Sequence, residues 1–199
     1  MAHHPDSDRL TRALARCLAK SAPWSGVLYR SASPRYATRD DLLAGAGSKS
    51  AGARWNPPKS FRTVYASLDI ETALAEALAH FKHYNLPVAK AMPRVIVALE
   101  ARLRRVLDLS DGAVRHALSV SQRRLLSEPW REENKRGREA LTQALGRLAY
   151  EADLEGLLVP SAARRQGRNL VIFPANLDVP QSWLRLVNKA QLPRGPWPT

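Results

Sequence analysis

Apolar residues recur with a helical period in two stretches of the first half of the chain. Residues 8–20, DRLTRALARCLAK, place apolar side chains on one face and basic side chains on the other. Residues 68–84, LDIETALAEALAHFKHY, show the same period, and Asp69 stands where a helix N-cap is expected. Both stretches are therefore predicted to be helices. The apolar face of the first is expected to pack on the domain and consists of Leu10, Ala13, Leu14, Cys17 and Leu18.

Short runs rich in β-branched and aromatic residues predict strands between the helices. These runs cover residues 26–32, 63–67, 94–100, 105–110, 156–161, 169–175 and 182–187. Further helices are predicted over 39–43, over two short parts of 111–126 and over 133–152, whereas the glycine- and serine-rich residues 45–58 predict a loop. Strands and helices lack the regular alternation of a doubly wound sheet. The pattern favours an α+β fold around a mixed or antiparallel sheet.

The length of 199 residues fits one ordinary domain. We expect an N-terminal amphipathic helix or arm over residues 1–25, the domain over 26–187 and a proline-rich C-terminal tail over 188–199. No apolar run reaches the roughly 18 residues of a membrane span, and the N-terminus lacks the apolar core of a secretory signal. A cytoplasmic protein without membrane contact is therefore expected. The single cysteine, Cys17, excludes an intramolecular disulfide and a cysteine-based zinc cluster.

The formal net charge of +13 is the unusual feature of the composition. A basic protein of this size attracts polyanions such as nucleic acid, an anionic cofactor or an acidic partner protein. The basic residues are spread along the whole chain, however, so the charge is equally consistent with a solubilising surface. The sequence does not assign a role to the charged segment 111–138, which contains Trp130; a lid and a partner-binding surface are the two interpretations.

Glu76 lies off the apolar stripe of the second predicted helix, on a face that it shares with Thr72, His80 and His83. This face permits three interpretations: a solvated polar surface, a metal site of Glu76, His80 and His83, or a catalytic carboxylate in a cleft. The usual helical zinc motif spaces its two histidines four residues apart, whereas here the spacing is three. No metal site is therefore expected.

The stretch GARWNPP, residues 52–58, combines Arg54 and Trp55 with a glycine and two stiffening prolines. A guanidinium fork suits phosphate or carboxylate, and tryptophan offers a large apolar face. Two interpretations remain open. Trp55 could plug the edge of the core while Arg54 forms a structural ion pair, or the stiff loop could hold Arg54 at a binding site. Arg30, at the end of a predicted strand, raises the same question.

Five segments in order, taken together, resemble the RES domain family, the toxin component of RES–Xre toxin–antitoxin systems. The resemblance covers roughly residues 26–187. It rests on LYRSA (28–32), GARWNPP (52–58), VYASLDIETALAE (64–76), LTQALGRLAYEADLEGLLVPSAA (141–163) and NLVIFPANL (169–177). The arginine, glutamate and serine that give the family its name fall on Arg30, Glu76 and Ser161. The family's tyrosine falls on Tyr65, and the arginine of its RWNP segment on Arg54.

The resemblance implies an ADP-ribosyltransferase-like single domain with sheets flanking a central cleft, and NAD as substrate. The implied activity is a toxin that depletes NAD by cleaving the nicotinamide–ribose bond, through hydrolysis or phosphorolysis. The alternative is mono-ADP-ribosylation of a protein acceptor, and a third is a non-catalytic basic nucleic-acid-binding module. The implied partner is an Xre-type helix-turn-helix antitoxin, through which alone the protein would contact DNA. Nicotinamide is already a good leaving group, so no metal is required.

The same resemblance assigns roles within the site. Glu76, Arg30 and Tyr65 are expected to be catalytic, with the Glu76 carboxylate stabilising positive charge on the ribose. Arg30 or Arg54 is expected to clamp the pyrophosphate, and the Tyr65 ring to lie against nicotinamide or ribose. Ser161 is expected to reach the nicotinamide amide or a phosphate. Thr142 and Gln143 are the alternatives for that polar contact, and His80 is expected to orient Glu76.

Overall fold

The structure, a computed structural model, describes residues 1–187 of the chain, apart from the side chain of His80. The predicted C-terminal tail, residues 188–199, lies outside the described residues. Its strands are β1 (Ala22–Ala32), β2 (Val64–Ser67), β3 (Val95–Asp108), β4 (Gly156–Pro160), β5 (Arg168–Ile172) and β6 (Trp183–Leu186). Each of these elements overlaps a strand predicted from the sequence.

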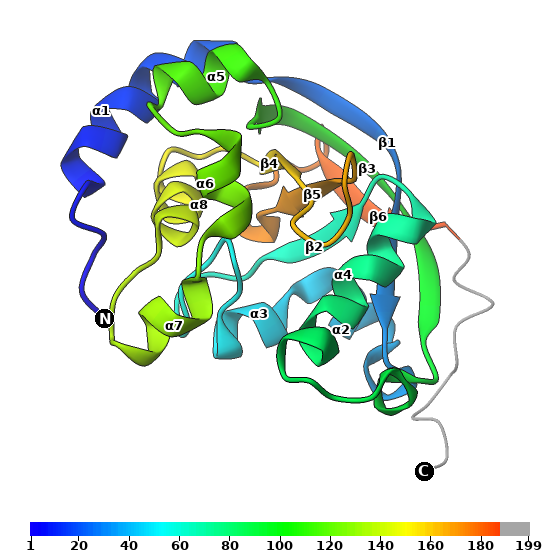
Figure 1. Cartoon of the computed structure of the whole chain (residues 1–199). Helices are drawn as coiled ribbons and strands as arrows, with labels where there is room; N and C mark the ends of the chain where they lie inside the picture. The colour runs from blue at the N-terminus through cyan, green and yellow to red at the C-terminus, as the bar shows by residue number, and fades with distance from the viewer. Residues whose placement is uncertain (188–199) are drawn as a thin grey trace.

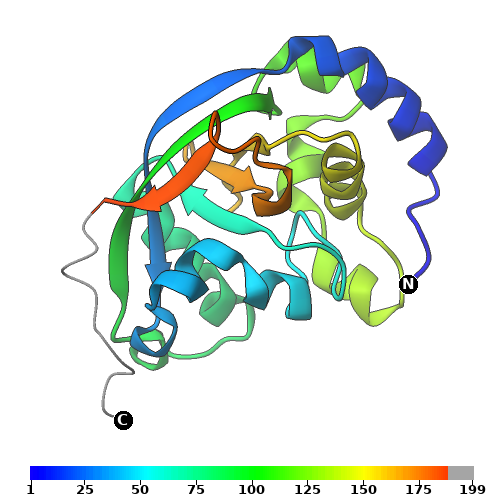
Figure 2. The same cartoon turned by 180° about the vertical axis from the view of Figure 1, so that it is seen from behind.

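The described strands form one sheet that curls back on itself (Figures 1 and 2). Its order is β1–β2–β5–β4–β3–β6, and β1 also pairs with β3, so five strands close a barrel-like ring with β6 attached to β3. The β3–β4 pair is parallel and the other pairs are antiparallel. The predicted mixed sheet in a single α/β domain is therefore confirmed. It is one closed sheet, however, where the resemblance implied sheets on either side of a cleft.

Helices lie around the ring in two groups (Figures 1 and 2). One end is covered by α1 (Ser7–Cys17), α5 (Gly112–Ala117), α6 (Gln122–Ser127) and α8 (Leu141–Glu151), with α7 (Trp130–Lys135) beside them. The other group comprises α2 (Arg39–Ala44), α3 (Ala46–Ala51) and α4 (Ile70–His83). Short 3-10 helices cover Leu18–Lys20, Pro34–Tyr36, Val88–Ala91 and Pro174–Asn176. In the described part of the chain, no helix is long and apolar enough to cross a membrane.

Three sequence predictions differ from the structure in their boundaries. The segments 94–100 and 105–110 belong to one continuous strand, β3, because buried residues alternate with exposed ones through the intervening charges. The predicted helix 133–152 is interrupted at Gly137, whose φ of 70° is left-handed and ends the helical geometry between α7 and α8. The predicted loop 45–58 contains the short helix α3.

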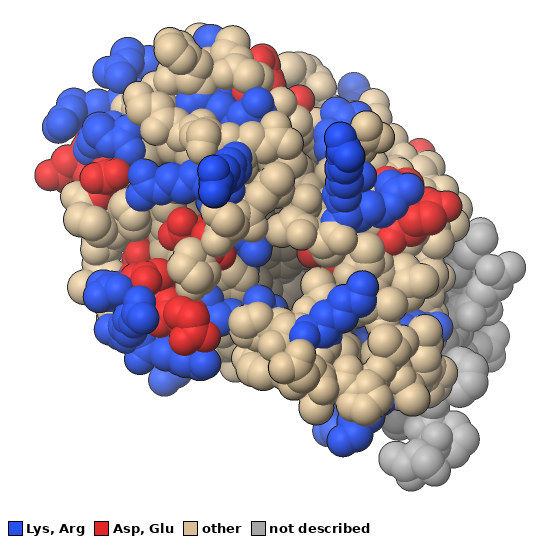
Figure 3. Space-filling model, viewed as in Figure 1, with Lys and Arg blue, Asp and Glu red and all other residues tan. Residues whose placement is uncertain are grey.

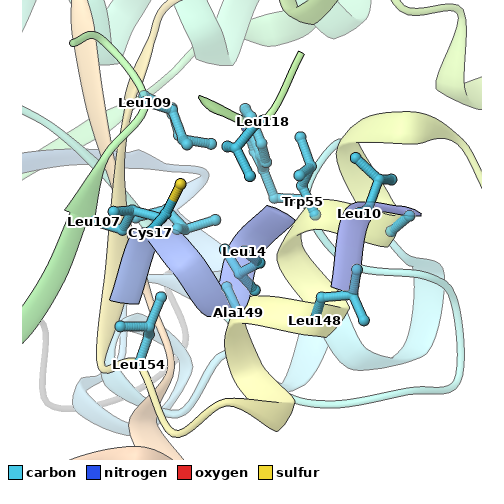
Figure 4. Packing of buried hydrophobic residues seen from close by; sticks show 14 of the residues in the cluster. Leu10, Leu14, Cys17, Trp55, Leu107, Leu109, Leu118, Leu148, Ala149 and Leu154 are labelled. Carbon is cyan, nitrogen blue, oxygen red and sulfur yellow. The ribbon is translucent and has the colours of Figure 1, made fainter. Parts of the chain in front are cut away.

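The apolar face of α1 belongs to the main hydrophobic core (Figure 4). Leu10 and Cys17 are fully buried, and they share a cluster with Trp55 and with the inner face of α8. A second cluster fills the other side of the sheet from β1, β2, β3 and β5. The first cluster fixes α8 and the 52–58 loop against each other, and this contact positions one wall of the site.

Candidate active site

A cavity of about 460 Å³ opens between α4, α7 and the strands β1 and β2. Figure 3 shows the surface hollowed between the positions of α4 and α7 in Figure 1, with Lys and Arg atoms at the rim. The volume falls within the roughly 300–1,000 Å³ typical of small-ligand sites. The polar and aromatic residues of its wall are Tyr29, Arg30, Ser31, Arg54, Trp55, Tyr65, Ser67, Glu76, His83, Trp130, Arg131 and Asn169.

Helix α4 carries Glu76 into this cavity. The helix begins at a side-chain cap, in which Asp69 accepts hydrogen bonds from the Thr72 amide (2.7 Å) and the Thr72 hydroxyl (2.8 Å). Two turns into the helix, Glu76 Oε1 accepts hydrogen bonds from Ser161 Oγ (2.7 Å) and Asn169 Nδ2 (2.6 Å). No described residue donates to Oε2. The carboxylate is thus held by one oxygen and presents the other to the cavity, so the interpretation of a solvated face does not hold.

Backbone and side-chain contacts orient both donors to Glu76. Ser161 Oγ accepts from the amides of Ala163 (3.1 Å) and Arg164 (3.0 Å), which leaves its own proton for the carboxylate. Ser67 pairs with Asn169 across β2 and β5, and Ser67 Oγ donates to Asn169 Oδ1 (2.7 Å). This bond turns the Asn169 amide nitrogen towards Glu76. Ser161 itself is buried and does not line the cavity.

The approach of β5 to α4 depends on Gly167. A Cβ atom at this position would lie 2.6 Å from Thr72 Oγ1 and 3.1 Å from Ser161 Cβ. The glycine therefore allows the turn before β5 to bring Asn169 and Ser161 within reach of Glu76. Gly167, which lies between two predicted strands in the sequence, thus determines whether the two donors can reach the Glu76 carboxylate.

The GARWNPP loop is held rigidly against the core. Trp55 is 3% exposed, and its amide donates to the Tyr65 hydroxyl (3.1 Å), which in turn donates to Asn56 Oδ1 (2.8 Å). Gln143 Nε2 donates to the carbonyl of Ala53 (2.9 Å). The two interpretations of this loop are therefore combined: the tryptophan fills the core, and its neighbour Arg54 lines the cavity.

Arg54 makes no ion pair among the described residues. Its Nη1 instead donates to the carbonyls of Leu125 (3.0 Å) and Glu128 (3.3 Å), in and directly after α6. Burial lowers the pKa of Arg54, and the carboxylate of Glu76 acts in the opposite direction. The arginine remains cationic, since guanidinium groups do not lose their proton in proteins. Its Nε and Nη2 have no described partner and can bind an anion.

Two further arginines line the cavity. Arg30 donates through Nη1 to the carbonyl of Leu42 (3.2 Å), and burial lowers its pKa against the effect of Asp41. Arg131, which the sequence analysis did not single out, has a pKa lowered by burial and raised by Tyr84 and Glu76. Three guanidinium groups and one carboxylate make the cavity positively charged. Such a site attracts an anionic ligand.

Tyr65 presents its ring to the cavity and its hydroxyl to the GARWNPP loop. Burial raises the pKa of Tyr65, while the Trp55 amide and Arg54 lower it by less, so the hydroxyl stays protonated. Thr142 and Gln143 are buried in α8 and do not line the cavity. Gln143 pairs with Asn134 and with the loop, so its polar atoms are occupied by the protein.

Six polar or aromatic residues of the cavity wall were not assigned to the site by the sequence analysis: Tyr29, Ser31, Ser67, Trp130, Arg131 and Asn169. Asn169 had a detectable signal, because it is the polar residue that directly precedes the apolar run LVIF. Ser67 similarly follows an apolar strand. Nothing in the sequence separates Arg131 from the many other arginines.

Among the described residues, no group of three or more His, Cys, Asp or Glu side chains is arranged to hold a metal ion. The alternative metal site included His80, whose side chain lies outside the described part, as does the predicted contact between His80 and Glu76. Glu76 and His83 both line the cavity. The polar and aromatic groups of the described cavity wall are thus guanidinium, carboxylate, imidazole, hydroxyl, amide and aromatic ring groups.

Known proteins resemble this chain in sequence and in overall fold. The chain is 24% identical over 141 residues to NAD(+) phosphorylase MbcT of Mycobacterium tuberculosis and of Mycobacterium bovis, covering 70% of this chain and 69% of theirs. The crystal structure of the M. tuberculosis MbcT–MbcA toxin–antitoxin complex aligns with a TM-score of 0.67 at 24% identity, over 89% of this chain and 88% of that one. A family model, RES domain, matches residues 32–194, most of the length of the protein. The chain therefore belongs to the RES domain family.

Proposed function

We propose that this protein cleaves the nicotinamide–ribose bond of NAD with inorganic phosphate as acceptor, as the toxin of a bacterial toxin–antitoxin pair in the cytoplasm. One observation carries the proposal: the Glu76 carboxylate is fixed through Oε1 and open at Oε2 in a cavity with three arginines. The mycobacterial relatives are named NAD(+) phosphorylase, which supports the choice of reaction.

The chemistry of NAD fits these groups. When the bond between nicotinamide N1 and ribose C1′ breaks, nicotinamide leaves as a neutral molecule with the bonding electrons. Positive charge then develops at C1′ and the ring oxygen, where a fixed carboxylate stabilises it. A phosphate oxygen forms the new bond to C1′, and the products are nicotinamide and ADP-ribose 1″-phosphate. Glu76 supplies the negative charge, and its two donors prevent it from rotating away.

The arginines suit the rest of the substrate. The pyrophosphate of NAD carries two negative charges, and guanidinium groups bind such oxygens through paired, charge-assisted hydrogen bonds. Arg54 and Arg30 come from different elements, the 52–58 loop and β1. Arg30 donates through Nη1 to one protein carbonyl and Arg54 through Nη1 to two, whereas Nε and Nη2 of each have no described partner. Phosphate, the second substrate, is also an anion and benefits from the same positive cavity.

The structural relationship and the partner of this protein belong to the same proposal. An ADP-ribosyltransferase-like relationship is supported by the combination of a closed mixed sheet with a glutamate that lines a cavity of about 460 Å³. An antitoxin partner is supported by the MbcT structure, which was solved as a toxin–antitoxin complex. We infer an Xre-type partner with a helix-turn-helix domain, so that this protein reaches DNA only through it. The net charge of +13 favours an acidic contact surface on that partner.

The test is nicotinamide release from NAD by the purified protein, with and without phosphate. We expect phosphate-dependent release and formation of ADP-ribose 1″-phosphate. Glu76→Gln should lower kcat by about 100-fold or more, because the isosteric amide keeps the shape and removes the charge. The matched control is Glu71→Gln, which changes an exposed glutamate on the same helix and should retain activity.

Other results would change the assignment in defined ways. Free ADP-ribose without a need for phosphate would indicate water as the acceptor. Label transferred to a lysate protein would indicate ADP-ribosylation. Full activity of Glu76→Gln would remove the carboxylate from the mechanism, and an unchanged NAD pool would reject the proposed function.

A further inference from the structure

The cavity wall opposite α4 is built by α7, a helix in the charged segment whose role the sequence did not reveal. Two consecutive residues, Trp130 and Arg131, line the cavity from this helix. The Arg131 guanidinium lies over the Trp130 ring, 4.2 Å from its centroid. An aromatic plane and a guanidinium plane thus stand together at the wall. In the proposed reaction at Glu76, Arg131 contributes only to the positive charge of the cavity, and Trp130 has no role.

The contacts of Arg54 connect this helix to the reacting end. Arg54 lines the same cavity as Glu76, and its Nη1 donates to the carbonyl of Glu128, two residues before Trp130. Arg54 therefore stands beside the start of α7. If Glu76 marks the nicotinamide ribose and Arg54 binds the pyrophosphate, the space beside Arg131 is left for the remaining part of the dinucleotide.

The position of α7 is fixed by contacts to the same loop that carries Arg54. Arg54 Nη1 donates to the carbonyl of Leu125 in α6 and to that of Glu128, in the short connection between α6 and α7. At the other end of the helix, Asn134 and Gln143 exchange two side-chain hydrogen bonds of 2.7 and 2.9 Å. The Trp130–Arg131 pair is therefore held at a set distance from Arg54, as a preformed subsite requires.

We propose that Trp130 and Arg131 form the subsite for the adenosine half of NAD. This inference rests on the proposed function, since it takes Glu76 as the reacting end. Purine rings stack on tryptophan and on guanidinium planes, and both surfaces are present here within one pair. The subsite makes the enzyme selective for the complete dinucleotide over a nicotinamide mononucleotide.

The experiment compares NAD with nicotinamide mononucleotide, which has the same scissile bond and lacks the adenosine. We expect the wild type to have a higher kcat/KM for NAD. Trp130→Ala and Arg131→Ala should reduce the ratio of the two kcat/KM values by about 10-fold or more, mainly through KM for NAD, given what one stacked base contributes. An equal loss on both substrates, or an unchanged ratio, would overturn the proposal.

The chain offers a matched control pair. Arg185 lies over the Trp183 ring at 4.3 Å on β6, and neither residue lines the cavity. Trp183→Ala and Arg185→Ala should leave the NAD to mononucleotide ratio unchanged. A fall in the ratio for these variants as well would show that the effect is not local to α7 and would overturn the assignment.

A binding measurement separates failure of this inference from failure of the proposed function. Calorimetry with ADP-ribose and with ribose 5-phosphate needs no turnover. If the wild type cleaves neither substrate but binds ADP-ribose more tightly than Trp130→Ala does, the subsite stands and the reaction is wrong. If ADP-ribose binds equally to both proteins, or to neither, the subsite is rejected whatever the activity.

Discussion

Tyr65 lines the cavity with its ring, whereas its hydroxyl makes hydrogen bonds within the protein. The hydroxyl accepts from the Trp55 amide and donates to Asn56, so both of its hydrogen bonds hold the GARWNPP loop. Burial raises the pKa of Tyr65 well above its usual value. A phenol in this state stays protonated near neutral pH, and its proton is already donated in the hydrogen bond to Asn56. In the proposed reaction, Tyr65 therefore contributes its ring and the position of the loop.

This assignment predicts how stability depends on alkaline pH. The folded protein keeps the Tyr65 proton, while the unfolded chain loses it above about pH 10. The stabilisation is fully present below pH 10 and is lost as the pH rises further, with a slope of up to about 1.4 kcal/mol per pH unit. Urea unfolding between pH 9 and 11 should show a shallower decline for Tyr65→Phe than for the wild type. Tyr36→Phe, at an exposed tyrosine, should match the wild type; equal slopes for all three proteins would contradict the assignment.

The residues of the site differ in how far the sequence could predict them. Arg30, Arg54 and Glu76 come from distant segments, and the structure brings them to one cavity. Their residue types and the family resemblance were enough for that expectation. The hydrogen bond from Ser161 to Glu76 was not predictable, because it depends on which way the hydroxyl points after the amides of residues 163 and 164 occupy its lone pairs. This arrangement requires the packing of α4, the turn after β4 and β5 against one another, which the local sequence does not specify.

Among the elements, α8 depends on one glycine, Gly146, for its close packing against the loop that carries Arg54. At Gly146, a Cβ atom would lie 1.8 Å from the Trp55 carbonyl oxygen, so only glycine lets the helix touch the loop backbone. Gly146→Ala should therefore push the loop and α8 apart. We expect a loss of about 1–3 kcal/mol or more in the free energy of unfolding and a Tm lower by several degrees.

A second glycine provides the control for this prediction. Gly47 lies in the short helix α3, and a Cβ atom there would meet nothing within 4 Å. Gly47→Ala should leave the protein equally stable or more stable by up to about 1 kcal/mol. Thermal unfolding of the two variants side by side decides the matter. A Gly146→Ala protein as stable as the wild type would show that the loop is not packed as described.

Secondary structure was predictable wherever one periodicity ran without interruption. Both α1 and α4 overlap the predicted helical stretches, but only α1 buries its apolar stripe, since Ile70 in the first turn of α4 is 45% exposed. The predicted boundaries were wrong where the local pattern of apolar and polar residues disagrees with the tertiary contacts. The arginines between 101 and 106 resembled the end of a strand, yet they face outward from β3 while Leu103 remains buried in the core. Local hydrophilicity therefore divided a strand that pairing with β1 keeps continuous.

At the scale of the whole molecule, the cavity depends on closure of the sheet. Its wall takes residues from β1, β2, β5, α4 and α7, which span the chain from residue 29 to residue 169. The ring closes through a single register pair between β1 and β2, Tyr29 with Ser67, and through the long pairing of β1 with β3. The family match begins at residue 32, whereas β1 begins at Ala22 and is joined to α1 by the 3-10 helix Leu18–Lys20. We propose that the N-terminal segment is part of the folding unit.

Leu14 tests this proposal, because it lies on α1 and is 3% exposed within the main core. Leu14→Ala should lower the free energy of unfolding by about 2–5 kcal/mol, as removal of a buried leucine side chain does elsewhere. Since Trp55 belongs to the same cluster, urea unfolding followed by tryptophan fluorescence and by circular dichroism should shift together. Arg12→Ala, an exposed residue on the same helix, should change stability by less than about 0.5 kcal/mol. If Leu14→Ala left the midpoint of the main unfolding transition unchanged, α1 would be an independent arm. The first 20 residues would then not contribute to the stability of the cavity.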